Sequence, residues 1–212
     1  DVDLQKVAAS IQVKDGEDLR ATGKRRIDEI MQGTPGIQAQ SNATGLTLFV
    51  RGVDAQGGQP NVVTQNPVAI LIDGVAQSRQ EVVRGGTVDV SRAEIMRGPQ
   101  STTLGANALA GAVSLVSNQP VLGAYEGNGS IDVGNYNKHA IEGVFNAPLG
   151  DRNAVRLAYS AEKRDGYISA KTGDSDLSTV RAKWRFQPRD GVNSVFTLSR
   201  QKIGGNGTQQ NV

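Results

Sequence analysis

The stretch of sequence that decides the fold runs from residue 94 to residue 117 and reads Glu94-Ile95-Met96-Arg97-Gly98-Pro99-Gln100-Ser101-Thr102-Thr103-Leu104-Gly105-Ala106-Asn107-Ala108-Leu109-Ala110-Gly111-Ala112-Val113-Ser114-Leu115-Val116-Ser117. It opens with an arginine-glycine step, continues through small and polar residues, and ends in a branched apolar run. A glycine lets the backbone turn or approach a neighbour closely, while the preceding guanidinium can fork onto a carboxylate. The small and polar residues favour a hydrated, deformable contact over an apolar core.

The composition excludes several kinds of site. The 212 residues include 26 glycines, no cysteine and a single histidine, His139. Glycine at this level favours turns and close backbone contacts over long helices. Because cysteine is missing and histidine occurs once, disulfide scaffolds and the usual thiolate or multi-histidine metal centres are excluded. We expect neither a metal site nor a cofactor.

Charge and nucleophiles argue against nucleic-acid binding and against catalysis. Lys and Arg number 23 and Asp and Glu 21, so the net charge of +2 is too small for phosphate neutralisation. Ser101 lacks the flanking glycines of a nucleophile elbow, and we expect no catalytic residue and no enzyme. No apolar run approaches the roughly 20 residues of a membrane-spanning helix, so helical membrane proteins are excluded. Membrane β-barrels are not excluded, because their strands are short and alternate.

The first part of the chain predicts a small mixed α/β domain. Residues 9–13 suggest a strand that ends in a turn at Asp15 and Gly16, and the apolar spacing from Asp18 to Met31 suggests one short helix. Glycine and proline at residues 33–36 end that helix. Three dense apolar runs predict strands, and continuous runs of this kind indicate strands buried on both faces. These runs are Leu46 to Val50, Val68 to Ile72 and Val113 to Val116.

From Ile131 onward the pattern changes to strict alternation in segments of about ten residues. Between residues 180 and 187, one face carries Val180, Ala182, Trp184 and Phe186, and the other carries Arg181, Lys183, Arg185 and Gln187. Short turns at residues 148–151 and 188–191 contrast with a long hydrophilic stretch at residues 164–177. This layout is typical of an up-and-down outer-membrane barrel.

A soluble antiparallel sheet with one wet face is an equal alternative on this segment alone. The aromatic residues just before a proline turn, Trp184 and Phe186, favour the membrane interpretation, because an interfacial girdle belongs there. About five strands leave two edges that hydrocarbon does not tolerate, so they must close with further strands. We therefore expect the chain to be a piece of a longer protein, broken in the polar loop at residues 204–212.

Four ordered motifs resemble those of TonB-dependent outer-membrane transporters. They are the stretch from Glu94 to Ser117, Phe49-Val50-Arg51-Gly52, Val68 to Val75, and Ile30 to Ile37. The resemblance implies an α+β plug domain at residues 1–120, followed at residues 121–212 by about the first five strands of an antiparallel transmembrane β-barrel. Plugged transporters have barrels of about 22 strands.

The resemblance also implies roles for particular residues. Arg51 and Arg97 would lock the plug to acidic residues of the barrel, whereas the alternative is that both only cap local turns. Five further residues belong to the plug signature: Gly52, Gly98, Pro99, Gly105 and Gly111. The apical loops would bind substrate through Gln56, Gln59, Asn61, Gln77, Ser78, Arg79 and Asn42. The sequence departs from the family in having no recognisable TonB box before Asp3, and in having Leu104 where an aromatic residue is common.

Family resemblance implies active transport of a scarce nutrient, most often an iron-siderophore complex, across the bacterial outer membrane. The partners implied are the TonB-ExbB-ExbD system, a small-molecule substrate and outer-membrane lipid, but no nucleic acid. Two alternatives remain open at this point. One is a soluble binding module made of a small α/β domain and an antiparallel sheet, and the other is a passive or signalling outer-membrane receptor.

Overall fold

The computed structural model describes residues 10–24, 26–42, 45–50, 53–54, 68–77, 87–98, 108, 111–166 and 173–205. The chain divides into two compact units: unit 1 comprises Asp1–Arg84 and Val90–Ser117, and unit 2 comprises Gly85–Asp89 and Asn118–Val212. The chain therefore enters unit 2 at residue 85, returns to unit 1 at residue 90 and leaves it again at residue 118. The domain boundary at residue 120 stays a prediction.

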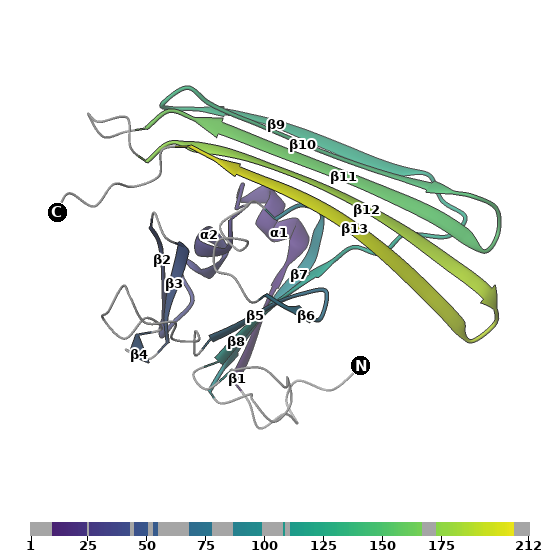
Figure 1. Ribbon diagram of the computed structural model, residues 1–212, viewed down its shortest axis with the longest axis horizontal. Helices are drawn as coiled ribbons and strands as arrows, with labels where there is room; N and C mark the ends of the chain where they lie inside the picture. The colour runs from purple at the N-terminus through teal and green to yellow at the C-terminus, as the bar shows by residue number, and fades with distance from the viewer. Residues whose placement is uncertain are drawn as a thin grey trace. The chain divides into compact units, whose positions relative to one another are not determined.

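Unit 1 is an α+β structure with two sheets (Figure 1). The larger sheet has the order β1-β7-β8-β5-β6, with β1 at Ser10–Asp15, β7 at Val90–Arg97, β8 at Gly111–Ser117, β5 at Val68–Ile72 and β6 at Val75–Ala76. Strands β5 and β8 are parallel, and the other neighbours are antiparallel. The smaller sheet contains β2 at Ile37–Asn42, β3 at Gly45–Val50 and β4 at Val53–Asp54. The strands predicted from the three apolar runs are confirmed as β3, β5 and β8.

The prediction of one helix between residues 18 and 31 is wrong, because two short helices replace it. They are α1 at Gly16–Ala21 and α2 at Ile27–Met31. The Asp15 carboxylate accepts a hydrogen bond from the Glu17 amide at 2.7 Å, so Asp15 caps a helix where a turn was expected. Gly23, at φ +66°, then takes the chain out of helical geometry.

The main core of unit 1 lies between the helices and the larger sheet. Its buried residues are Leu19, Ile27, Ile30, Met31, Ile37, Val68, Ile70, Val90, Ala93, Ile95, Val113 and Leu115. A second cluster packs on the opposite face of β5 and β8 and contains Ala69, Leu71, Ala108 and Ala112. Strands β5 and β8 are thus buried on both faces, as their unbroken apolar runs predicted.

Strand β1 is tied to the end of α2 by a lysine. Lys14 Nζ donates to the backbone carbonyls of Ile30 and Gln32, which are left open at the helix C-terminus. Burial, and then the nearby charge of Lys24, lower the pKa of Lys14.

Within the described residues, no helix is long and apolar enough to cross a membrane.

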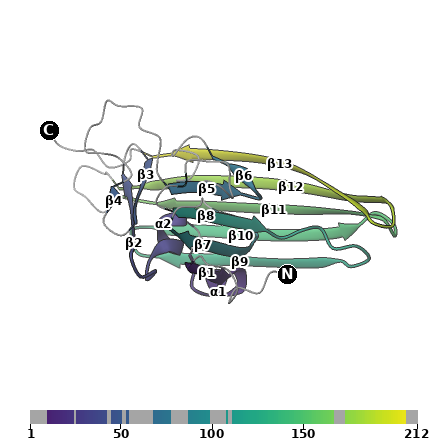
Figure 2. The same cartoon turned by 90° about the horizontal axis from the view of Figure 1, so that it is seen from below.

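Unit 2 is a five-stranded antiparallel sheet in which every strand pairs with its neighbour in sequence (Figures 1 and 2). Its strands are β9 at Glu126–Gly134, β10 at Lys138–Pro148, β11 at Asn153–Arg164, β12 at Ser175–Arg189 and β13 at Val192–Gly204. Tight turns at residues 149–152 and 190–191 join strands at one end. At the other end lie the turn at residues 135–137, the end of β11 at Arg164 and the start of β12 at Ser175.

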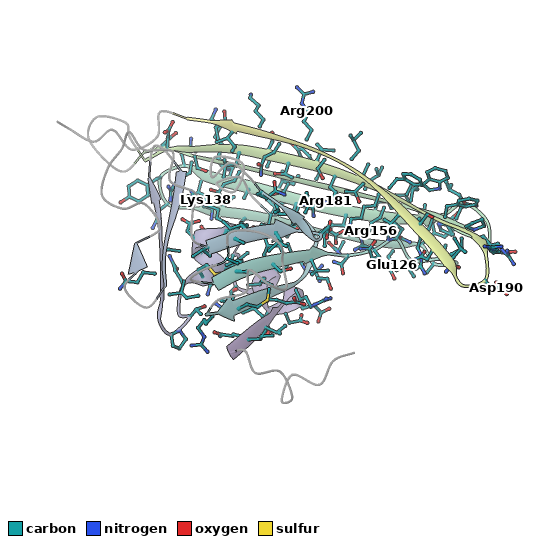
Figure 3. The ribbon with its side chains drawn as sticks, turned by 60° about the horizontal axis from the view of Figure 1, so that its bottom comes forward. Glu126, Lys138, Arg156, Arg181, Asp190 and Arg200 are labelled. Carbon is teal, nitrogen blue, oxygen red and sulfur yellow. The ribbon has the colours of Figure 1, made fainter. Side chains whose placement is uncertain are left out.

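The two faces of this sheet have opposite chemistry. The exposed apolar side chains share one face and are Ile131, Val133, Ile141, Phe145, Leu157, Tyr159, Val180, Trp184, Phe196 and Leu198. The other face carries buried polar and charged side chains, which are Glu142, Asn146, Arg156, Ser160, Glu162, Thr179, Arg181 and Lys183. Figure 3 shows Arg156 and Arg181 on the polar side, with Arg200 pointing to the other. The predicted alternation is confirmed.

Of the two signature glycines that the structure describes, Gly98 and Gly111, the second has the tighter surroundings, and its replacement by alanine tests the packing of β7 on β8. A Cβ atom at this position would lie 2.5 Å from the Met96 carbonyl oxygen, so the two strands would have to separate. We expect G111A to destabilise unit 1 by about 1 to 3 kcal/mol, the range for overpacked sites. The urea concentration at which unit 1 of the purified protein becomes cleavable by protease measures this change.

The matched control is G143A on β10, where an added Cβ meets no atom within 4 Å. G143A should leave the urea dependence unchanged. Equal behaviour of the two variants would show that the close approach at Gly111 does not limit stability.

Candidate functional site

A buried ion pair holds residue 89 on the polar face of the sheet. Arg156, on β11, forks onto the Asp89 carboxylate, with Nε at 2.6 Å from Oδ2 and Nη2 at 2.8 Å from Oδ1. The remaining Nη1 donates to Glu126 Oε2 on β9 at 3.2 Å. The two paired side chains are only 7% and 2% exposed, whereas Glu126 is half exposed. Because a guanidinium buried without a partner is strongly unfavourable, the two carboxylates make this position possible.

Asp89 is also fixed through its backbone and by Asn118. Its φ angle of +55° lies in the left-handed region, which aspartate and asparagine tolerate better than most residues. Asn118 Nδ2 donates to Asp89 Oδ1 at 2.7 Å, and the Asn118 amide donates to the Asp89 carbonyl at 2.9 Å. The two segments at which the chain leaves and re-enters unit 2 are therefore joined to each other.

Val88 adds an apolar contact and a second arginine. Its side chain is completely buried and packs with Val144 and Ala158, which are small positions on the polar face. Arg181 Nη1 donates to the Val88 carbonyl at 2.7 Å. The short segment Val88-Asp89 thus makes one apolar contact and receives hydrogen bonds from arginines on β11 and β12.

Asn146 holds the second segment, residues 118–124, on the same face. This fully buried side chain accepts from the Val121 amide at 2.9 Å and donates to the carbonyls of Val121 and Ala124 at 2.9 and 2.8 Å. Arg185 Nη1 donates to the Pro120 carbonyl at 3.2 Å. Polar side chains of the sheet therefore provide hydrogen-bond partners for backbone groups of residues 118–124, which lie outside helices and strands. We call residues 87–89 and 118–124, with the side chains that hold them, the anchor.

The remaining polar face has mixed charge. Lys183 lies directly opposite Arg156 in the register, and Glu142 and Glu162 are buried on the neighbouring strands. Lys138 Nζ lies 3.7 Å from Glu162 Oε2, near the end of the sheet that contains the turn at residues 135–137. Charges that water cannot reach need partners of opposite sign, so such a face suits contact with protein or a water-filled interior rather than hydrocarbon.

Of the two predicted locking residues, only Arg97 is described. It ends β7, and its Nη1 donates to the Pro35 carbonyl at 3.1 Å, a contact inside unit 1. Gly98 follows with φ +96°, as a turn after the strand requires. Locking of the plug by Arg97 stays a prediction, and so does the locking role of Arg51.

Two predicted substrate contacts can be placed in part. Gln77 follows β6, where its amide donates to the Ile70 carbonyl at 2.8 Å and its side chain to the Val75 carbonyl at 2.9 Å. Asn42 ends β2 opposite Gly45. The other predicted residues lie outside the described residues; they are Arg51, Gly52, Gln56, Gln59, Asn61, Ser78, Arg79, Pro99 and Gly105. Their assignments stay predictions.

The anchor is not predictable from the sequence patterns of either segment. The strict alternation from Ile131 onward puts Arg156 on the face opposite Val155 and Leu157, but its partner Asp89 is 67 positions away in the chain. Asp89 lies in none of the four family motifs, and no neighbouring residue marks it as a partner of β11. In the described ranges, no three His, Cys, Asp or Glu side chains gather into a possible metal site.

Comparison with known proteins identifies the family. Residues 3–112 match the TonB-dependent receptor plug domain family. The pesticin receptor of Yersinia enterocolitica is 28% identical over 185 residues, which cover 82% of this chain and 26% of the receptor. The chain thus spans about a quarter of the length of the curated relatives it matches.

Solved structures show the same fold. The ferric yersiniabactin uptake receptor of Yersinia pestis superposes with a TM-score of 0.77 at 23% identity, covering 91% of this chain and 31% of the receptor. The ferripyoverdine receptor of the Pseudomonas aeruginosa outer membrane, bound to ferripyoverdine, superposes with a TM-score of 0.80 at 15% identity, covering 100% of this chain and 29% of the receptor. With the plug family matched over more than half of its residues, the chain belongs to the TonB-dependent receptors.

Proposed function

We propose that the chain is the plug and the first wall strands of a transporter that takes up an iron-siderophore complex across the bacterial outer membrane. Membership of this receptor family makes the protein an outer-membrane receptor and not an enzyme. The observation that carries the proposal is the combination, in one chain, of a plug domain with a sheet that exposes apolar side chains and buries charged ones.

The chemistry of the sheet supports a place in a membrane wall. Arg156, Arg181 and Lys183 share the polar face. Turning that face to lipid would cost roughly 2 to 4 kcal/mol for each cation near the midplane. The opposite face exposes large apolar side chains, with Leu198 at 76%. Strands β9 and β13 each pair on one side only in this sheet, and further strands would close the barrel.

The names of similar receptors support an iron-siderophore complex as the proposed cargo. Their names include ferric yersiniabactin and ferripyoverdine, both iron complexes. Loops beyond β4 and β6 would bind the cargo through Gln56, Gln59, Asn61, Gln77, Ser78 and Arg79, and the end of β2 would add Asn42. Arg51 and Arg97 would lock the plug, and Gly52, Gly98, Pro99, Gly105 and Gly111 would shape its signature segment.

Energy would come from the TonB-ExbB-ExbD system. Binding of cargo on the outer side must change the exposure of the segment that TonB pulls on the inner side, which is thermodynamic coupling between two sites. A hydrated, polar contact between plug and barrel suits this cycle, because water can replace protein hydrogen bonds as the plug rearranges.

Uptake assays test the function directly. In a strain whose own siderophore receptors are deleted, the full-length protein should import radiolabelled iron bound to yersiniabactin or pyoverdine. Import should stop when TonB is deleted or the ion gradient is collapsed, because the plug blocks passive flow. An inactive control is the same strain with an empty vector.

Import that persists without TonB would contradict active transport and favour a passive receptor. Binding of either complex without any import would favour a signalling receptor. Failure to bind or import either complex would contradict the proposed cargo.

The apical residues have a separate binding test. The triple variant Q56A/Q59A/N61A removes three hydrogen-bonding side chains, each worth about 0.5 to 1.5 kcal/mol. We expect the dissociation constant of the ferric siderophore to rise at least about tenfold, which corresponds to 1.4 kcal/mol. The control is Q32A/Q38A, which truncates two exposed glutamines elsewhere in unit 1. Equal affinity of the two variants would exclude this loop from the binding site.

A further inference from the structure

We propose that the Asp89-Arg156 ion pair fastens the plug to the barrel wall and keeps the channel closed before cargo arrives. This inference rests on the proposed function and names the residues that carry out one part of it. The pair has the reverse polarity of the lock implied for Arg51 and Arg97, because here the carboxylate precedes a plug strand and the arginine belongs to a wall strand.

Burial distinguishes this pair from surface ion pairs. The exposed pair Arg152-Asp190, at 3.6 Å on the tight turns, can exchange its partner for water. Arg156 and Asp89 are removed from water and meet through two short, charge-assisted hydrogen bonds. Removing one partner leaves the other charge buried and unpaired, so the segment must move to let water in.

The position of Asp89 in the chain connects the pair to both ends of the plug signature segment. Val90 begins β7 directly after Asp89, and Asn118 directly follows the end of β8 at Ser117. Val90 and Ser117 are partners in the β7-β8 register, and Asn118 donates to Asp89. Both ends of residues 90–117, which contain the plug signature, are therefore fixed where Arg156 binds.

Contacts inside unit 1 carry this fixation further into the plug. The Asp73 carboxylate accepts from the Ser117 amide at 2.7 Å and from the Ser117 hydroxyl at 2.6 Å. Asp73 lies in the turn between β5 and β6, and β5 is parallel to β8. Asp73, directly after β5, is thus hydrogen-bonded to Ser117, and the next residue in the chain, Asn118, donates to Asp89.

Leakage of the full-length receptor measures the proposed role. The variants are D89N and R156Q, which remove one charge each, with R156K keeping the charge but losing the fork. Asparagine tolerates the left-handed backbone at residue 89, so D89N adds no strain of its own. Purified receptors are placed in planar lipid bilayers without siderophore or TonB, and the ion current through each is recorded. Heat-modifiable migration on detergent gels, in which boiled and unboiled samples run differently, confirms that every barrel is folded.

We expect D89N and R156Q each to raise the time-averaged current at least about tenfold, because a buried charge loses its partner. R156K should fall between R156Q and the unaltered protein. The double variant D89N/R156Q should leak no more than the worse single variant, since both changes break one interaction. The control R152Q, at an exposed arginine, should behave as the unaltered protein.

Single variants that leak no more than R152Q would overturn the proposal, and so would additive effects in the double variant. If D89N or R156Q fails to fold, R156K carries the test, and currents equal to those of the unaltered protein would then refute it. Siderophore binding and import distinguish a failure of this proposal from a failure of the proposed function. Normal binding and import with unchanged currents would contradict only the role of the ion pair. Raised currents in a protein that imports neither siderophore would contradict only the cargo assignment.

Discussion

The alternation of charged and apolar side chains along β10, β11 and β12 constrains the rest of unit 2. Arg156, Arg181 and Lys183 lie on one face, and Leu157, Val180 and Trp184 lie on the other. Because the side-chain period of a strand is two, a register slip of one residue would exchange the two faces. Placing three cations against hydrocarbon would cost more than a typical domain can spare, so only one orientation of the sheet is available.

Once the polar face is fixed, it needs partners, and part of the chain supplies them. Asp89 neutralises Arg156, and backbone carbonyls at Val88 and Pro120 accept from Arg181 and Arg185. Unit 1 is organised differently, around apolar side chains such as Ile30, Ile95 and Val113. Unit 2 thus supplies partners for its polar face from its own residues, while unit 1 keeps a separate apolar core.

Local pattern predicted what depends on local pattern. The strands β3, β5 and β8 followed from dense apolar runs, and the two faces of β10 to β13 from strict alternation. The helical region was predicted as one helix because Leu19, Ile27 and Ile30 share a loose helical spacing, which hid the break at Gly23. The anchor depends on a pairing between Asp89 and Arg156 across 67 positions, and no periodicity within either segment contains that information. The predicted locking and substrate residues rest on resemblance to the family.

The most direct test of the account measures what surrounds each face of the sheet. Spin labels placed at Leu157 and Leu198, and at Ser160 and Thr179, sample the apolar and the polar face of the full-length receptor in a lipid bilayer. If the apolar face meets lipid, molecular oxygen, which concentrates in lipid, should broaden the spectra of the first two labels strongly and those of the last two weakly. Equal oxygen accessibility on both faces, or access of a water-soluble nickel reagent to Leu157 and Leu198, would contradict the placement of this sheet in a membrane wall.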